Sequence, residues 1–170
     1  MEKIPEPAPR AGVLRADFPS PLGVLRLESE GDALLSARFT KEEPRFSDRS
    51  PVLDAALRWL ERYFAGEDPG ETPPLAPAGT AFRRAVWALL AEIPYGETVS
   101  YGALARRYAA VSGRRTSARA VGQAVGANPV ALFLPCHRVL GASGALTGYA
   151  WGVARKKALL ALEGVRLPPL

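Results

Sequence analysis

The sequence contains only one cysteine and one histidine in 170 residues, and it has no long run of apolar residues. A single cysteine cannot form a disulfide within the chain, which is typical of proteins from a reducing compartment. One cysteine and one histidine also supply too few ligands for a zinc site, so we expect no metal. No stretch approaches the roughly 20 apolar residues that cross a bilayer, and the first residues lack the apolar core of a secretory signal. These absences predict a cytoplasmic protein that does not interact with a membrane.

Acidic residues are almost missing from the second half of the chain. Residues 79–170 hold 12 Lys and Arg against 3 Asp and Glu, whereas residues 1–78 hold 10 against 14. Such an excess of positive charge favours a polyanionic partner, such as a nucleic acid. An arginine-rich solvated surface would give the same counts, so charge alone leaves both interpretations open. Overall, 48% hydrophobic and 23% charged residues are typical of a folded globular protein.

The first 66 residues have the pattern of a small α/β module. Partly alternating apolar residues predict three strands, over residues 13–18, 22–28 and 33–39. Ser50 and Pro51 begin a helix, because proline is favoured at the first helical position. Apolar residues at helical spacing continue to Tyr63, and Gly66 ends the run. The expected fold of this module is a small antiparallel sheet with one helix.

Residues 67–79 contain four prolines and two glycines and are predicted to be a linker. The balance of charge changes sign at the same place, which supports a boundary between modules. Residues 80–170 then form a mainly α domain. Its predicted helices are one over residues 82–90 after a Thr80 cap, one over 101–108 after a Ser100 cap, and one over about 117–125.

The last two of these helices and the turn between them are typical of a helix-turn-helix. The turn carries Arg114 and Arg115, which we expect to contact DNA phosphates. The second helix of the pair holds Gly122 and ends near Gly126, and each glycine costs about 1 kcal/mol of helix stability relative to alanine. Small side chains allow the backbone to approach either a neighbouring helix or DNA, and the sequence leaves both alternatives open.

The only cysteine and the only histidine are neighbours, Cys136 and His137. The apolar residues before them predict a buried strand that ends at the cysteine. A thiolate is a strong nucleophile, and a nearby imidazole lowers the free energy of forming it. Neighbours on an extended strand point to opposite faces, so contact between the two side chains needs a turn or a bridging water molecule. A buried, inert cysteine beside a structural histidine is the alternative.

Residues 135–139, Pro-Cys-His-Arg-Val, resemble the active-site motif of the O6-alkylguanine-DNA alkyltransferases. Further blocks resemble that family in the same order; they are Gly79-Thr80-Ala81-Phe82, Val86-Trp87, Ile93-Pro94-Tyr95-Gly96, Val99-Ser100-Tyr101, Ala118-Arg119-Ala120-Val121-Gly122, Asn128-Pro129, Gly144, Thr147-Gly148-Tyr149 and Leu162-Glu163-Gly164. The resemblance implies DNA repair by irreversible, single-turnover transfer of an alkyl group from O6 of guanine to Cys136. O4 of alkylated thymine is a further candidate substrate, and no cofactor is implied.

The resemblance also implies roles in catalysis. Cys136 would attack the alkyl carbon, and His137 would act as its base through a water molecule. Glu163 would bond to His137 and orient it, as the third member of the chain. Tyr101 would help to rotate the base out of the duplex and donate a hydrogen bond to N3 of guanine.

The resemblance further implies a pocket for the flipped base. Asn128 would hold the turn between the recognition helix and the cysteine. Tyr149 and the backbone near Val139 and Ala150 would line the pocket, with Trp151 at its rim.

The DNA surface implied by the resemblance is the helix that begins near Ser117. Arg119 would fill the gap that the flipped base leaves in the stack. Ala118, Gly122 and Gln123 complete the expected contacts, because a helix with small side chains can enter the narrow minor groove. The expected partner is double-stranded DNA that contains O6-alkylguanine, bound by a monomer.

Two features depart from the family pattern. Residues 109–113 are extra compared with compact members and are expected to lengthen the turn of the helix-turn-helix. The N-terminal module matches only in general pattern and contains no Cys or His, so the zinc site of some members cannot form there, and we expect a scaffold. The alternatives are an alkyltransferase-like lesion binder without transfer activity, a cysteine hydrolase and a helix-turn-helix regulator.

Overall fold

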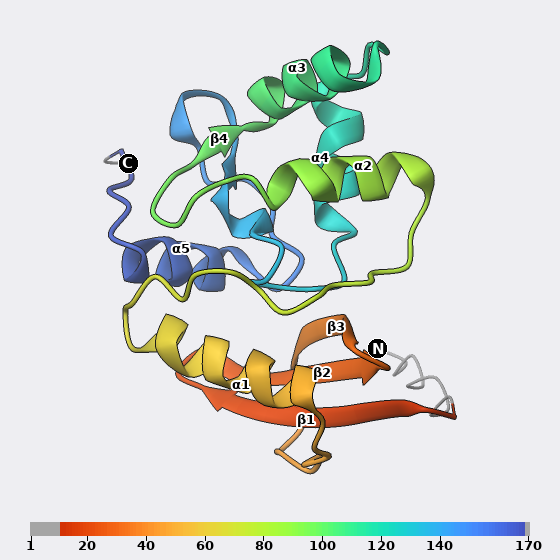
Figure 1. The fold of residues 1–170 in the computed structure, drawn as a ribbon. Helices are drawn as coiled ribbons and strands as arrows, with labels where there is room; N and C mark the ends of the chain where they lie inside the picture. The colour runs from red at the N-terminus through yellow and green to blue at the C-terminus, as the bar shows by residue number, and fades with distance from the viewer. Residues whose placement is uncertain (1–10, 169–170) are drawn as a thin grey trace, which may run out of the picture.

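A three-stranded sheet covered by one helix packs beside a larger helical part in the structure, a computed structural model that describes residues 11–168 (Figure 1). Strands β1 (Val13–Ser20), β2 (Gly23–Glu30) and β3 (Ala33–Thr40) are antiparallel in the order β1-β2-β3. The three predicted strands are confirmed, with small differences at their ends. Residues 1–10 of the predicted first module lie outside the described range.

Helix α1 (Pro51–Phe64) covers one face of this sheet (Figure 1). It begins where it is predicted to begin, because the Leu53 amide donates to Ser50 Oγ at 3.1 Å. Its buried residues are Val52, Leu53, Ala56, Trp59, Leu60 and Tyr63. They pack against the sheet, whose Leu25 and Leu27 are fully buried. Each buried Val or Leu side chain among them contributes roughly 1.5–3 kcal/mol by leaving water.

The predicted linker is held against the N-terminal module. The Leu34 amide donates to Pro74 O at 2.8 Å, and the Ala76 amide donates to Leu34 O at 2.9 Å, so the segment runs along β3. The Trp59 indole donates to Gly70 O at 3.2 Å. The segment then passes between the sheet and the helical part (Figure 1). Since one buried cluster spans both parts, boundaries at 66 and 80 remain a prediction.

The helical part contains α2 (Ala81–Leu90), α3 (Tyr101–Ser112), α4 (Ala118–Gly126) and α5 (Val153–Leu162). The predicted caps are confirmed, since Thr80 and Ser100 accept from the backbone amides of Arg83 and Ala103. Two short parallel strands, β4 (Val99–Ser100) and β5 (Val139–Leu140), join the start of α3 to the segment after the cysteine. This pair of strands is not evident from the sequence pattern. No helix within residues 11–168 has both the length and the apolar character to cross a membrane.

The expected lengthening of the helix-turn-helix turn is wrong. Helix α3 continues through Ser112, so residues 109–112 add helix and not loop. Alanines at 109 and 110 favour this continuation. Gly113 ends α3 in the left-handed conformation, at φ 70°, and its amide donates to Ala109 O at 2.9 Å. The turn between α3 and α4 therefore spans residues 113–117.

We expect Gly79→Ala to destabilise the protein. A Cβ at this position would lie 2.5 Å from the ring of Trp87. That ring cannot move freely, because it is buried and donates to Ala124 O at 2.8 Å. The overpacking should lower the free energy of unfolding by about 1–3 kcal/mol, measured by urea denaturation. In the matched control Gly126→Ala the new methyl group meets nothing within 4 Å, so no loss is expected. Equal stability of parent and Gly79→Ala would contradict the clash.

Candidate active site

Cys136 lies in a tight turn, so the expected position at the end of a strand is wrong. Cys136–Arg138 form a single turn of 3-10 helix, η1, in which the Arg138 amide donates to Pro135 O at 3.0 Å. The apolar run before the cysteine is buried as expected. Burial alone does not distinguish a strand from a buried turn, which explains the error. Neighbouring side chains point to opposite faces on an extended strand but not in a helical turn. The turn therefore allows Cys136 and His137 to belong to one site.

Both halves of the molecule hold the segment before the cysteine. Asn128 donates from Nδ2 to Leu134 O at 2.8 Å and accepts from the Val130 amide at 2.9 Å, as expected for a residue that fixes this turn. Leu132 has a positive φ of 71°, which is uncommon for leucine. Phe133 next to it stacks on Trp59 of α1, with ring centroids 4.5 Å apart. The position of Cys136 therefore depends on α1 as well as on α4.

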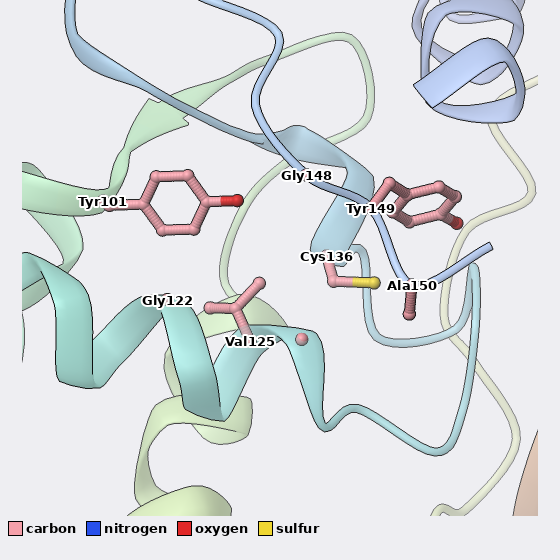
Figure 2. A pocket seen from close by; sticks show the side chains of 8 residues that line it. Tyr101, Gly122, Val125, Cys136, Gly148, Tyr149 and Ala150 are labelled. Carbon is pink, nitrogen blue, oxygen red and sulfur yellow. The ribbon is translucent and has the colours of Figure 1, made fainter. Parts of the chain in front are cut away.

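A cavity of about 230 Å³ opens beside Cys136. It is lined by Tyr101, Gly122, Val125, Gly126, Cys136, Gly148, Tyr149 and Ala150. Figure 2 shows the Tyr101 hydroxyl and the Cys136 sulfur in the space between α4 and the segment that carries Tyr149 and Ala150. The structure thus brings the predicted nucleophile together with two of the predicted pocket residues and with Tyr101.

Three predicted pocket residues, Asn128, Val139 and Trp151, do not line this cavity. Asn128 and Val139 are buried behind it. The Trp151 ring packs edge-on against Tyr149 at 5.5 Å and against Phe39 of β3 at 6.3 Å. Trp151 therefore connects the pocket wall to the N-terminal sheet.

Arg155 of α5 reinforces this connection. Its guanidinium donates to Leu22 O at 2.8 Å and to Trp151 O at 3.0 Å. The same group lies 4.6 Å from the centroid of the Phe39 ring. The segment that carries the pocket wall is thus attached to the N-terminal sheet through both side-chain and backbone contacts.

A buried carboxylate lies behind His137. His137 Nε2 is hydrogen-bonded to Glu163 Oε2, as the resemblance implies. The same oxygen accepts from the Tyr63 hydroxyl at 2.7 Å. The other oxygen, Oε1, accepts from Arg138 Nε at 2.7 Å and from the Gly96 amide at 3.0 Å. Four donors from three segments of the chain therefore saturate Glu163.

These contacts fix the protonation states of the pair. Burial alone would raise the pKa of Glu163, but the hydrogen bonds from His137 and the Gly96 amide and the charge of Arg138 hold it below its usual value. Burial lowers the pKa of His137 more than Glu163 raises it, so the imidazole is neutral near pH 7 and Arg138 is the lasting counter-charge of Glu163. A neutral imidazole beside a carboxylate carries its proton on Nε2. Nδ1, which is buried without a partner among the described protein groups, is then a proton acceptor.

The thiol of Cys136 is protonated at rest. Burial raises its pKa to about 11, although a hydrogen bond from Asn128 and the charge of Lys156 act in the opposite direction. A thiol is a weak nucleophile compared with a thiolate, so reaction requires a base close by. Nδ1 of His137 is suited to that task.

Lys156 is a buried cation that the sequence does not reveal, because lysine in a helix usually faces solvent. Its Nζ donates to Val139 O at 2.6 Å and to Thr147 O at 2.9 Å. Burial lowers the pKa of Lys156 to about 8. The ammonium group therefore ties the strand after the cysteine to the loop that carries the pocket wall.

Two further site residues are absent from the sequence prediction. Tyr63 follows the apolar spacing of α1 and so has the pattern of a core residue. Arg138 is part of the cysteine motif, but nothing in its spacing indicates a bond to Glu163. A buried carboxylate needs several hydrogen-bond donors. This requirement is the only feature by which the sequence could have indicated Tyr63 and Arg138.

The predicted DNA-contacting residues belong to α4 and to the turn before it, and one of them, Gly122, lines the cavity. Arg114 and Arg115 are exposed in the turn before α4, and Arg119 is exposed on that helix. Ala118 and Gln123 are also exposed on α4, and Gly122 is half-buried. None of these arginines forms an ion pair with any residue from 11 to 168.

The glycines of α4 are not required by packing against another helix. A Cβ at position 122 would meet the Tyr101 ring at 3.6 Å, an ordinary contact, and one at position 126 would meet nothing within 4 Å. Of the two alternatives left open by the sequence, close helix packing is therefore not supported. The small residues leave an open surface at the cavity.

Comparison with known proteins assigns the chain to a family. A family model described as 6-O-methylguanine DNA methyltransferase, DNA binding domain, matches residues 81–165. A methylated-DNA–protein-cysteine methyltransferase of Methanosarcina acetivorans is 43% identical over 155 residues, covering 88% of this chain and 97% of that protein. The chain belongs to this methyltransferase family. The protein of the same name from Mycobacterium tuberculosis is 45% identical over 154 residues, covering 88% and 91%.

Solved structures of the methyltransferase family share the fold. The O6-methylguanine methyltransferase of Mycobacterium tuberculosis gives a TM-score of 0.77 at 42% identity, covering 92% of this chain and 95% of that chain. OGT of the same organism in complex with DNA gives a TM-score of 0.76 at 44% identity, covering 88% and 91%. The similarity includes both the α/β module and the mainly α part, so the predicted fold class is confirmed.

We expect Gly122→Ala to stabilise the protein and weaken its binding to duplex DNA. Alanine favours a helix over glycine by up to about 1 kcal/mol, and the new methyl group has room in the free protein. The same group would add bulk beside Tyr101, on the helix that we expect to approach the minor groove. Thermal melts should show a higher Tm, and fluorescence anisotropy should show an affinity lower by several-fold. An unchanged affinity would mean that α4 does not approach DNA closely at this position.

Proposed function

We propose that this protein repairs alkylated DNA by moving an alkyl group from O6 of guanine to Sγ of Cys136, once per molecule. The observation that carries the proposal is the position of Cys136, whose thiol faces a cavity beside α4 and has a base and a carboxylate behind it. Membership of the methyltransferase family agrees with this chemistry.

The reaction is a displacement at the alkyl carbon. A sulfur–carbon bond forms at Cys136 as the carbon–O6 bond breaks, and the bonding electrons leave with guanine. The thiol proton passes through a water molecule to Nδ1 of His137, the unpaired ring nitrogen. Glu163 stabilises the imidazolium that results and stays ionised because Arg138 is bonded to it. The Tyr101 hydroxyl, which faces the cavity, donates a hydrogen bond to the departing base.

The product explains why each molecule reacts once. A thioether at Cys136 has no acyl or phosphoryl centre that a water molecule could attack. Only the protein thiol accepts the alkyl group, so the proposal needs no cofactor.

The substrate base must leave the duplex before the thiol can reach it, and unstacking costs a few kcal/mol. We assign Arg119 to the gap left in the stack and the small residues of α4 to the minor groove. Arg114 and Arg115 would contact phosphates and make binding weaken as salt increases. Alkylated duplex DNA is therefore the proposed partner. O4-alkylthymine, which presents a similar alkyl ether, is a further candidate.

We further propose that the protein acts as a monomer in the cytoplasm. The only cysteine is the proposed nucleophile, and a reducing compartment keeps such a thiol from oxidation.

The alternatives are less well supported. A lesion binder without transfer activity has no use for a cysteine nucleophile with an adjacent base. A cysteine hydrolase would need to hydrolyse its intermediate, and a sequence-specific regulator would not need the cavity. Transfer to Cys136 accounts for both the cysteine with its adjacent base and the cavity.

Cys136→Ala should abolish alkyl transfer while leaving DNA binding intact, because Ala removes the nucleophile and changes no exposed residue. The test is mass spectrometry of the protein after incubation with an oligonucleotide that contains O6-methylguanine. The parent should gain one methyl group on the peptide that contains Cys136, and the variant should gain none. Methyl transfer to the variant, or an unmodified parent, would contradict the proposed function.

Arg119→Ala should slow transfer from duplex DNA far more than transfer from free O6-methylguanine base, because only the duplex requires a base to be flipped. A loss of about 1.4 kcal/mol of stabilisation corresponds to a tenfold slower rate, and we expect at least this effect with duplex. The control is Arg84→Ala, which removes an exposed arginine from α2. Equal slowing with both substrates would exclude a role for Arg119 in base flipping.

A further inference from the structure

The hydroxyl group of Tyr63 reaches the active site from the N-terminal half of the chain. It donates to Glu163 Oε2 at 2.7 Å and lies 3.4 Å from His137 Nε2. His137 is bonded to that same oxygen, so two donors share it. The tyrosine belongs to α1, whereas the other two residues belong to the second half of the chain. Its hydroxyl is thus the one side-chain donor to the carboxylate from the N-terminal module, among residues 11–168.

The phenol is held in one orientation. Its ring is fully buried and stacks on Trp59, with centroids 5.6 Å apart and planes 8° apart. The rings of Phe64 and Tyr95 pack against it edge-on, at 5.3 Å and 6.1 Å. Burial and the nearby charge of Glu163 raise the pKa of Tyr63, so the hydroxyl remains protonated. A phenylalanine ring would fill the same space, and therefore core packing alone does not account for the hydroxyl.

We propose that Tyr63 is a positioning residue of the transfer reaction, which controls how strongly Glu163 holds His137 by sharing a carboxylate oxygen with it. The inference rests on the proposed function. A donor on Oε2 withdraws negative charge from the oxygen that faces Nε2. The carboxylate then orients the imidazole but stabilises the imidazolium less. His137 consequently stays neutral, and able to accept a proton, until the thiol of Cys136 reacts.

The other groups around His137 are known and would remain in place. Glu163 favours the protonated ring, whereas the charges of Arg138 and Lys156 oppose it. The thiol of Cys136 is uncharged at neutral pH because burial raises its pKa to about 11. The hydroxyl of Tyr95 bonds to Leu162 O at 3.4 Å and not to the carboxylate. Tyr63→Phe therefore removes one hydrogen bond from Glu163 and leaves every charge in place.

The first test measures the titration of His137, which is the only histidine of the chain and gives an unambiguous NMR signal. Loss of the shared donor should strengthen the hold of Glu163 on the imidazolium. The midpoint of the His137 titration should therefore rise in Tyr63→Phe, by about half a pH unit to one unit. The control Tyr95→Phe removes a hydroxyl from the adjacent ring and should leave the midpoint unchanged. Melting curves at each pH verify that all three proteins are folded.

The second test measures the rate of methyl transfer from O6-methylguanine DNA against pH. The acid limb of the profile should move to higher pH by the same amount in Tyr63→Phe. At the pH of the parent's midpoint the variant should then react several-fold more slowly, while on the alkaline plateau the two rates should nearly agree. A rate lowered equally at every pH, with an unchanged His137 midpoint, would show a purely structural role and overturn the proposal.

A third protein tests the proposal even if Tyr63→Phe alters the structure. With 3-fluorotyrosine placed at position 63, the phenol is more acidic and a stronger donor, so the His137 midpoint should fall. A midpoint that moves in the same direction as in Tyr63→Phe would contradict the proposal. If the parent transfers no methyl group, the proposed function fails, but the titrations still decide whether Tyr63 controls His137.

Discussion

The buried carboxylate of Glu163 is the group on which the rest of the site depends. An isolated carboxylate inside a protein is unstable, so it needs hydrogen-bond donors and a counter-charge. Those donors come from α1, from the loop before β4 and from the turn that contains the cysteine. Each bond places a different segment of the chain relative to Glu163. The requirement to satisfy one charge thus assembles the histidine, its neighbouring arginine and a tyrosine from the other module at one point.

The electrostatics of the site keep the thiol of Cys136 protonated until the reaction takes place. Burial keeps Cys136 protonated at rest, which protects a thiol that must survive until it meets damaged DNA. The proposed base, His137, is neutral for the same reason, since burial also disfavours the imidazolium. In the proposed reaction, charge develops on His137 only when alkyl transfer begins, and Glu163, which Arg138 keeps ionised, is already in place to compensate it.

The sequence predicts the elements better than the contacts between them. Strands β1 to β3 and the beginnings of α1, α2 and α3 follow from alternation, helical spacing and capping residues, which are local signals. The proposed nucleophile and its proposed partners Glu163 and His137 follow from the family motif. Local patterns fail where burial is the only signal, as for the cysteine turn and for Lys156 and Tyr63. Their roles depend on residues from distant parts of the chain, and spacing along the sequence carries no information about such contacts.

The attachment of the pocket wall to the N-terminal sheet has a consequence for how substrate range is encoded. Trp151 packs against Phe39, and Arg155 bonds to the backbone at Leu22, so residues of the sheet support the loop that borders the cavity. The width of the cavity is accordingly a property of two modules, although only one of them lines it. Substitutions in the N-terminal sheet are thus expected to change the position of the loop that borders the cavity, with every residue that lines it unchanged. Directed evolution confined to the second half of the chain samples only part of this variation.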